Sequence, residues 1–319
     1  MIRYLVATVA AFTLLSPVPA HAQQWPSKPI RFIVGFPPGG GIDFFARALG
    51  QKLQEQVGQA VVIENRAGAN GIIGADAVAK AAPDGYTVLI ANEAQIVVNQ
   101  HLYRSIPYDP VKDLAPVTEA VFAPIILYAH PSTPISSVKE LVDLAKAKPG
   151  SIAYASVGAG TPHHLTGELF KATAKIDMLH VPYKGGGPAT AAMLGGEIPI
   201  GFAGYSALGS ARSGKLKAIA VTRRVEAASD LPTFAEAGYP EVDLVTWHGV
   251  LVPAGTPKEI IDRLHDEVVK AIHSADLKAR FAKQGFGVTG TSPAEFAKRI
   301  QSDIPIYAKV VKQSGAKLD

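Results

Sequence analysis

The chain repeatedly places a short apolar run before a glycine-containing turn and a helical pattern. The run 30–34 predicts a buried strand, the turn at 36–41 ends in three successive glycines, and the apolar residues after it recur at helical spacing. The same order returns at 151–174 and 178–194. Strands that alternate with helices form a mostly parallel sheet covered on both faces, so the sequence predicts an α/β fold.

The remaining expected elements follow the same pattern of apolar runs, turn residues and helix caps. Thr161 followed by Pro162 is a strong helix start, because a threonine cap precedes a proline at the first helical position. The other expected strands lie at 60–64, 87–91, 124–129, 151–156, 178–181, 198–202 and 216–221. One expected helix is capped by Asp43 and reaches at least Val57, and a second runs through Ala82. The other expected helices span 137–148, 161–174, 185–194, 206–213, 257–274 and 292–313.

The first residues are expected to be a targeting segment and not part of the fold. Arg3 precedes an apolar stretch at 4–15, and two prolines then lead to the small-residue end at Ala22. This layout is typical of a secretory signal peptide, here residues 1–22 with cleavage after Ala22. The alternative is a membrane anchor, but the apolar stretch is shorter than the roughly 20 residues that span a bilayer.

Chain length favours two lobes with separate cores. Removing 22 residues from 319 leaves 297, which exceeds one ordinary domain. The sharpest shifts in composition fall near 120–124 and 245–255. We therefore expect one lobe over 23–122 plus 248–319, a second lobe over 123–247, and a ligand cleft between the lobes.

Composition excludes several classes of function. The chain has no cysteine, so it forms no disulfide and no thiolate–metal site. The net charge is +4, and no run of basic residues is longer than Arg223-Arg224. Scattered charge of this kind is typical of a solvated surface and does not indicate a nucleic-acid interface.

Three strand–turn–helix junctions, at 36–43, 156–164 and 184–190, are the best candidates for a binding site. The start of a helix presents unpaired N–H groups and a partial positive charge, which favour anions. Glycine allows a ligand to approach the backbone closely. The alternative is that the glycines serve only to make tight turns. That alternative is favoured for a single junction, whereas three junctions together favour a binding site.

Motifs for other chemistry are incomplete. No dinucleotide fingerprint, Walker lysine or nucleophile elbow is present. His163 and His164 have no third ligand at a metal-binding spacing, although one of them is expected to face the cleft. The sequence thus predicts a binding protein that is not an enzyme and that has no cofactor and no metal.

Several longer runs carry a resemblance to one family. They include 25–30 (Trp25 to Ile30), 36–43, 64–69, 107–110, 160–165 (Gly160 to Leu165), 180–185 and 253–257. These runs are similar to those of the Bug (TctC-like) receptors of tripartite tricarboxylate transporters, and they extend over the whole mature chain. The resemblance implies a type II periplasmic-binding-protein fold with two lobes that close on an organic carboxylate.

The resemblance also implies which residues line the cleft. The first-lobe turn would bind a carboxylate, with Asp43 favoured as a helix cap over a direct contact. The residues carried over from the family are Phe36, Pro37, Gly39, Gly40, Asp43, Asn92 and Gln95 in the first lobe, and Ser156, Gly158, Thr161 and His164 in the second.

One departure from the family pattern bears on the ligand. The family commonly has an aspartate where this chain has Ala203, followed by Gly204 and Tyr205. That aspartate would suit an ammonium group, so its replacement favours an acid without an amine, such as a dicarboxylate, a tricarboxylate or an aromatic acid. Ala203, Gly204 and Tyr205 are therefore also expected near the ligand.

The resemblance further implies a monomeric receptor in the periplasm that delivers its acid to the large and small membrane subunits of a permease. A sensor that uses the same cleft to signal through a membrane kinase is the alternative that the sequence leaves open.

Overall fold

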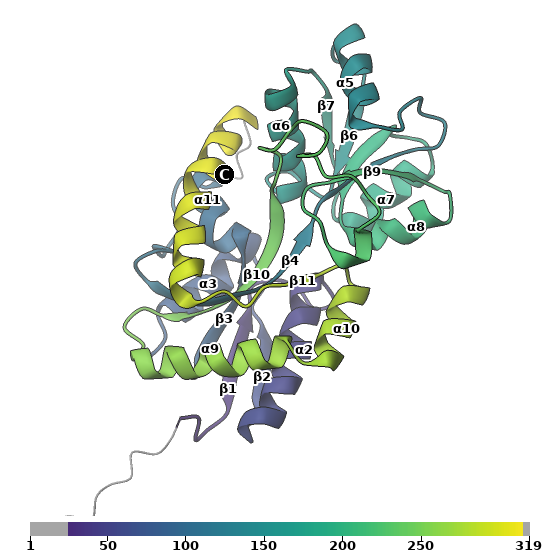
Figure 1. Cartoon of the computed structure of the whole chain (residues 1–319). Coiled ribbons are helices and arrows are strands. Elements are labelled where there is room, and N and C mark those ends of the chain that lie inside the picture. The colour runs from purple at the N-terminus through teal and green to yellow at the C-terminus, as the bar shows by residue number, and fades with distance from the viewer. Residues whose placement is uncertain (1–24, 315–319) are drawn as a thin grey trace, which may run out of the picture.

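The computed structural model describes residues 25–314, which form two lobes, each built on its own sheet (Figure 1). The expected signal peptide, residues 1–22, lies outside the described residues. The larger sheet has six strands in the order β11-β4-β10-β3-β1-β2. These strands are β1 (Ile30–Val34), β2 (Val61–Asn65), β3 (Thr87–Asn92), β4 (Leu114–Pro124), β10 (Val245–Pro253) and β11 (Gly287–Val288).

The second lobe repeats this arrangement on a smaller scale. Its five strands lie in the order β7-β6-β8-β5-β9. They are β5 (Ile126–Ala129), β6 (Ala153–Ser156), β7 (Leu179–Pro182), β8 (Ile200–Ala203) and β9 (Lys217–Val221). In the larger sheet β1 pairs in parallel with β2 and β3, and β10 pairs antiparallel with β3. In the smaller sheet β6 pairs in parallel with β7 and β8, and β5 pairs antiparallel with β8.

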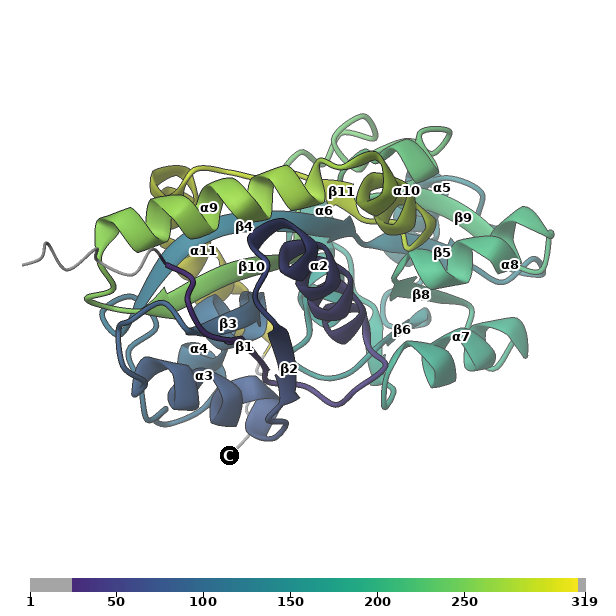
Figure 2. The same ribbon diagram turned by 90° about the horizontal axis from the view of Figure 1, so that it is seen from below.

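Helices cover both faces of each sheet. In the larger lobe α2 (Gly41–Val57) and α9 (Lys258–Ile272) pack together on one face, while α3 (Ile72–Ala79) and α4 (Asn99–Leu102) lie on the other (Figure 2). The remaining helices are α5 (Val138–Ala147), α6 (Pro162–Ala174), α7 (Gly186–Leu194), α8 (Leu208–Arg212), α10 (Ala275–Lys283) and α11 (Pro293–Ser314). The predicted two-lobed α/β fold, with mostly parallel sheets flanked by helices, is confirmed.

The lobes are joined through β4 and β10, which the sequence does not predict as strands. The two are antiparallel, and Pro124 at the end of β4 lies opposite Val245 at the start of β10. The sequence pattern of these strands is weak because proline and glycine are unfavourable inside strands. β4 contains Pro116 and Pro124, and β10 contains His248-Gly249. The expected lobe boundaries, 122/123 and 247/248, fall inside β4 and β10, and they stay a proposal.

The last helix, α11, ties the two lobes together. Phe296, Tyr307 and Val310 of α11 are buried in one apolar cluster with Leu89 of the first lobe and Phe202 of the second. The helix also packs directly against α6. Among residues 25–314, no helix is both long enough and apolar enough to cross a bilayer.

A buried carboxyl group lies where the lobes join. Glu93 follows β3, is 2% exposed, and accepts a hydrogen bond of 3.0 Å from the backbone N–H of Trp247 in β10. Burial raises the pKa of Glu93 to about 8, and the negative charge of Asp303 acts in the same direction. The folded protein therefore favours protonated Glu93 over a wide range of pH.

Replacing Glu93 with glutamine should remove a pH dependence of stability. The ordinary pKa of 4.5 is raised on folding, so the stabilising protonation is complete below about pH 4.5 and is lost as the pH rises toward 8. The free energy of unfolding of the native chain, relative to that of Glu93→Gln, should fall from pH 5 to pH 8 by at most about 5 kcal/mol.

Urea unfolding at pH 5, 6, 7 and 8 measures this difference. Glu259→Gln, at an exposed position on α9, serves as the matched control and should follow the native chain. Parallel pH profiles for the native chain and Glu93→Gln would contradict the role assigned to Glu93.

Candidate functional site

In each sheet the strand order reverses at one place, between β1 and β3 in the first lobe and between β6 and β8 in the second. Ligands of open α/β sheets bind beyond the carboxyl ends of the strands at such a switch point. The sequence-predicted residues lie at these four strand ends. Phe36, Pro37, Gly39, Gly40 and Asp43 follow β1. Asn92 is the last residue of β3, and Gln95 follows it. Ser156 is the last residue of β6, and Gly158, Thr161 and His164 follow it. Ala203 is the last residue of β8, and Gly204 and Tyr205 follow it.

Asp43 holds the first-lobe turn from inside. Its side chain is 5% exposed and accepts hydrogen bonds of 2.9 Å from the Gly39 N–H, from Arg47 Nε and from Asn65 Nδ2. Burial alone would raise the pKa of Asp43, but the hydrogen bonds from Arg47, Gly39 and Asn65 outweigh burial and lower the pKa to about 2. Asp43 therefore shapes the turn, while Pro37, Gly39 and Gly40 remain exposed.

The end of β3 leads straight into a one-turn π-helix at Ala94–Val98, an element often found at functional sites. Both polar atoms of the Gln95 side chain are hydrogen-bonded to the backbone. Its side chain donates to the Gly71 carbonyl at 3.1 Å and accepts from the Asn92 N–H at 3.2 Å. Gln95 is thus a buried residue that holds the end of β3 in place, and Asn92 beside it is half-buried.

In the second lobe Thr161 caps α6, as its sequence predicts. Its hydroxyl accepts from the His164 N–H at 3.5 Å and donates to the Gly158 carbonyl at 2.7 Å. Ser156, which is buried, bonds both to the backbone of Gly158 and to His180 Nε2, the latter at 2.7 Å. These bonds fix the shape of the turn from 156 to 161.

His164 lies behind this turn and is buried. Its Nδ1 accepts a 3.0 Å hydrogen bond from the Gly160 N–H, and its ring stacks on that of His180 with centroids 3.7 Å apart. Burial lowers the pKa of both rings to about 4, so both are neutral at pH 7. The sequence does not single out His180, and only the parallel pairing of β6 with β7 places it beside Ser156.

The fourth strand end, that of β8, contains Ala203, Gly204 and Tyr205. Ala203 is buried in β8 opposite Ile126, and the Gly204 carbonyl accepts a 3.1 Å bond from the Tyr128 hydroxyl. Tyr205 is half-buried and packs on Gly285, in the loop between α10 and β11 of the first lobe. Tyr205 therefore makes a contact between the lobes.

A second contact joins the lobes at the other switch-point turn. A Cβ built on Gly160 would lie 2.8 Å from Cδ1 of Leu102 in α4, so the glycine backbone meets that side chain directly. Gly160 also has a φ of +74°, which favours glycine. Two of the predicted turns of the second lobe are thus held against the first lobe.

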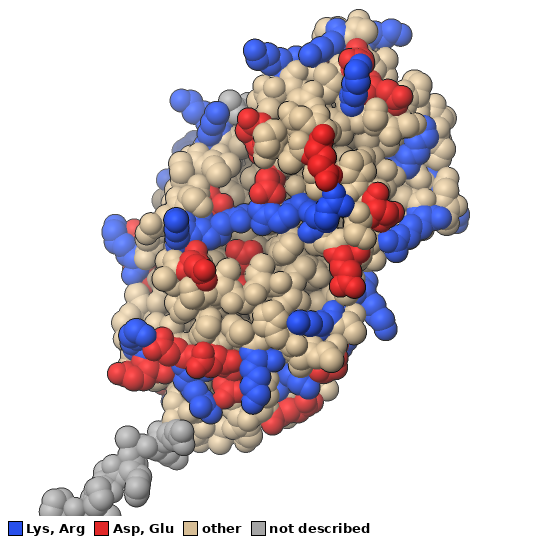
Figure 3. All heavy atoms as spheres, in the orientation of Figure 1, with Lys and Arg blue, Asp and Glu red and all other residues tan. Residues whose placement is uncertain are grey.

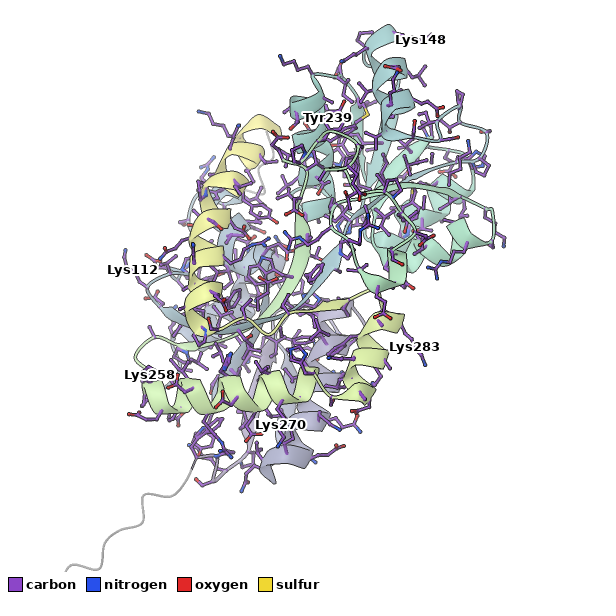
Figure 4. The ribbon with its side chains drawn as sticks, in the orientation of Figure 1. Lys112, Lys148, Tyr239, Lys258, Lys270 and Lys283 are labelled. Carbon is purple, nitrogen blue, oxygen red and sulfur yellow. The ribbon has the colours of Figure 1, made fainter. Side chains whose placement is uncertain are left out.

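None of the sequence-predicted site residues is a lysine or an arginine, and the nearby Arg47 is paired with Asp43. The lysines labelled in Figure 4 are exposed and lie on the outside of the molecule. Figure 3 shows basic and acidic side chains interspersed over both lobes. An anion in the cleft would therefore meet helix starts and backbone N–H groups, chiefly those of α2 and α6.

Two hollows occur on the described surface. One of about 220 Å³ lies between α11 and the second lobe and is lined by charged residues that include Arg223, Asp243, Arg299 and Asp303. Another of about 360 Å³ lies between the 224–227 segment and α10. Neither is lined by a residue that the sequence predicts for the cleft. Across residues 25–314, no group of three or more His, Asp or Glu side chains is placed to hold a metal ion.

The two-lobed fold, with a switch point in each sheet and inter-lobe contacts beside them, defines a solute-binding receptor of the periplasmic type. A family model described as the tripartite tricarboxylate transporter family receptor, TctC, matches residues 45–316. The chain belongs to this family, as its sequence predicts. The receptors of this family bind solutes for transport and are not enzymes.

Individual relatives agree along almost the whole chain. Protein BugT of Bordetella pertussis is 38% identical over 98% of this chain and 98% of its own length. An R. palustris protein solved with adipate is 33% identical over 92% of this chain and 100% of its own, with a TM-score of 0.79. The periplasmic binding protein BugD is 31% identical over 92% of this chain and 99% of its own, with a TM-score of 0.75.

Removing the Asp43 carboxylate should disorder the first-lobe turn. Asp43→Ala removes the acceptor of the Gly39 N–H and one of the two acceptors of Asn65 Nδ2, so we expect the free energy of unfolding to fall by about 2 kcal/mol. Asp262→Ala removes an exposed ion pair with Lys258 on α9 and should cost less than about 0.5 kcal/mol. Chemical denaturation of both variants tests this, and equal effects would show that Asp43 is an ordinary surface acid.

Proposed function

We propose that the chain is a monomeric periplasmic receptor that captures a small organic acid without an amine and delivers it to a two-subunit membrane permease. The main support is the placement of the α2 and α6 helix starts at the switch points of the two sheets. Each start attracts a carboxylate, and together they suit an acid that is held from both lobes. The relative solved with adipate is consistent with such a ligand.

The lack of a free carboxylate among the sequence-predicted site residues supports the exclusion of ligands with an amine. Asp43 is the single carboxylate among the sequence-predicted site residues, and it already accepts bonds from Gly39, Arg47 and Asn65. Ala203 and Gly204 place no acid at the end of β8. An ammonium group would therefore lose its hydration without gaining a charged partner, which is costly in a buried site.

Closure of the lobes follows from binding at both ends. A ligand drives closure only as far as it binds the closed form better than the open form. An acid that touches both α2 and α6 does so, since only the closed form satisfies both of its ends. Export through cleavage after Ala22 and delivery to the permease complete the proposal, and no observation on the described residues favours the alternative role in sensing.

A screen of thermal stability against organic acids tests the proposal, because a ligand that binds only the folded state raises the melting temperature. Succinate, adipate, citrate and terephthalate should include stabilising ligands, while aspartate and glutamate should have little effect. Calorimetry then gives the dissociation constants. Tight binding of aspartate or glutamate, with none of the other acids bound, would refute the exclusion of amines.

Thr161 offers a point mutation at the second-lobe turn. Thr161→Ala removes the α6 cap and the bond to the Gly158 carbonyl, so the ligand-binding turn loses its shape. We expect acid binding to weaken by about 1–3 kcal/mol. Thr173→Ala, near the far end of α6, is the matched control and should leave the dissociation constant unchanged. Unchanged affinity in Thr161→Ala would limit Thr161 to capping the helix.

A further inference from the structure

The hollow of about 360 Å³ between the 224–227 segment and α10 is formed by both lobes. One of its walls consists of α10 and β11 of the first lobe. The other wall is the segment after β9 in the second lobe, which leads into the one-turn helix η4 (Glu226–Ala228). Phe122 of β4 also lines the hollow. The width of the hollow therefore depends on how the two lobes are placed relative to each other.

The hollow and the switch points lie on opposite sides of the crossing strands β4 and β10. In the larger sheet β4 and β11 lie beyond β10, whereas β3 and β1 lie on its other side. In the smaller sheet β9 lies on one side of β5, whereas β8 and β6 lie on the other. Figure 2 shows α10 and β11 toward one edge of the molecule and β1 and β2 toward the other. The predicted cleft and the hollow are thus back to back.

Each wall of the hollow is anchored in the core of its own lobe. Phe281 of α10 is buried in an apolar cluster of the first lobe, and Val225 and Ala228 are buried in one of the second lobe. Phe122 packs against the second-lobe cluster and also against the cluster that both lobes share. We therefore expect each wall to follow its lobe, and Phe122 to mark the place where the lobes meet.

A rotation of the lobes about the crossing strands changes the cleft and the hollow in opposite directions. Closing the cleft separates the two walls of the hollow, and opening the cleft brings them together. A large side chain in the hollow is compressed when the walls approach, and such overpacking costs free energy. Atoms that fill the hollow therefore destabilise the open form more than the closed form.

The two walls carry small side chains where they line the hollow. Ala282 of α10 and Ala227 of η4 are both half-buried there. Small side chains let the walls approach each other, which favours the open form. The volume of the hollow is in the range of pockets that hold small organic molecules, so an indole ring has room in it once the walls are apart.

We propose that this hollow sets the balance between the open and closed forms of the receptor, and that Ala227 and Ala282 hold the balance toward the open form. Both residues lie on the opposite side of the crossing strands from the cleft, so they act on the affinity for every acid alike. This inference rests on the proposed function and extends it, because the acid is what drives closure.

A tryptophan on either wall tests the inference by calorimetry. Ala282→Trp and Ala227→Trp should tighten acid binding by about threefold to tenfold, because the apparent affinity scales with the fraction of closed molecules, commonly about 0.1–10% without ligand. The factor should be the same for every acid that binds in the thermal screen. Ala279→Trp, at an exposed position of α10 outside the hollow, is the control and should leave the dissociation constants unchanged.

Unchanged or weaker acid binding in both tryptophan variants would overturn the inference, and so would a factor that differs from one acid to another.

A distance across the hollow gives a second readout that needs no bulky side chain. The chain has no cysteine, so Glu226→Cys with Lys278→Cys places one spin label on each wall. A saturating acid from the thermal screen, beginning with adipate, should lengthen the distance between the labels. Labels at Lys258→Cys and Lys278→Cys lie on α9 and α10 of the same lobe, so their distance should stay constant.

An unchanged or shorter distance across the hollow would overturn the inference even if the tryptophan variants fail to fold. Failure of the proposed function gives a different result, since then no acid binds the native chain. If acids bind the native chain but neither the affinities nor the label distance change as described, only the inference about the hollow is wrong.

Discussion

The antiparallel pairing of β4 with β10 is the constraint on which the two-lobed arrangement depends. The chain passes from the first lobe to the second at Pro124 and returns at Val245, which is paired with Pro124. Both connections between the lobes therefore belong to the same pair of strands. The residues between Pro124 and Val245, 125–244, contain all five strands of the smaller sheet. α11 adds a third connection, because it packs on β4 and also against α6. The lobes therefore share a continuous apolar cluster near the join.

The same topology supports the proposed binding of an acid at a site with few charged side chains. Equivalent strand orders in the two sheets bring a helix start to each switch point, so the backbone supplies the positive potential. Side chains serve mainly to shape these turns: Asp43 braces the first and Thr161 the second. Neutral donors held in place bind an anion without first having to release a competing counterion of their own. Charged side chains remain free to keep the outer surface hydrated.

The sequence predicts the parallel parts of the fold well, because buried parallel strands and capped helices have strong local signals. Ile30–Val34, Thr161 and Pro162 lie where their patterns place them. It does not predict β4, β10 or α10, whose residues take their structure from long-range pairing and packing. For the candidate site, the four strand ends follow from the pattern of glycines and caps together with the family resemblance. The position of His180 does not, since its bond to Ser156 and its stacking on His164 depend on residues far along the chain.

The contact between Tyr205 and Gly285 has a consequence for how such a receptor adapts. Gly285 has a φ of +75°, and any side chain there would collide with the tyrosine ring. The apparent affinity of a receptor is its intrinsic affinity scaled by the fraction of molecules already in the competent state. A residue that only adjusts this fraction changes the working concentration range of the protein and leaves the choice of ligand alone. Under the proposed function, a substitution at the contact between Tyr205 and Gly285 would change the working concentration range, and a substitution at a ligand-contacting residue would change the selectivity.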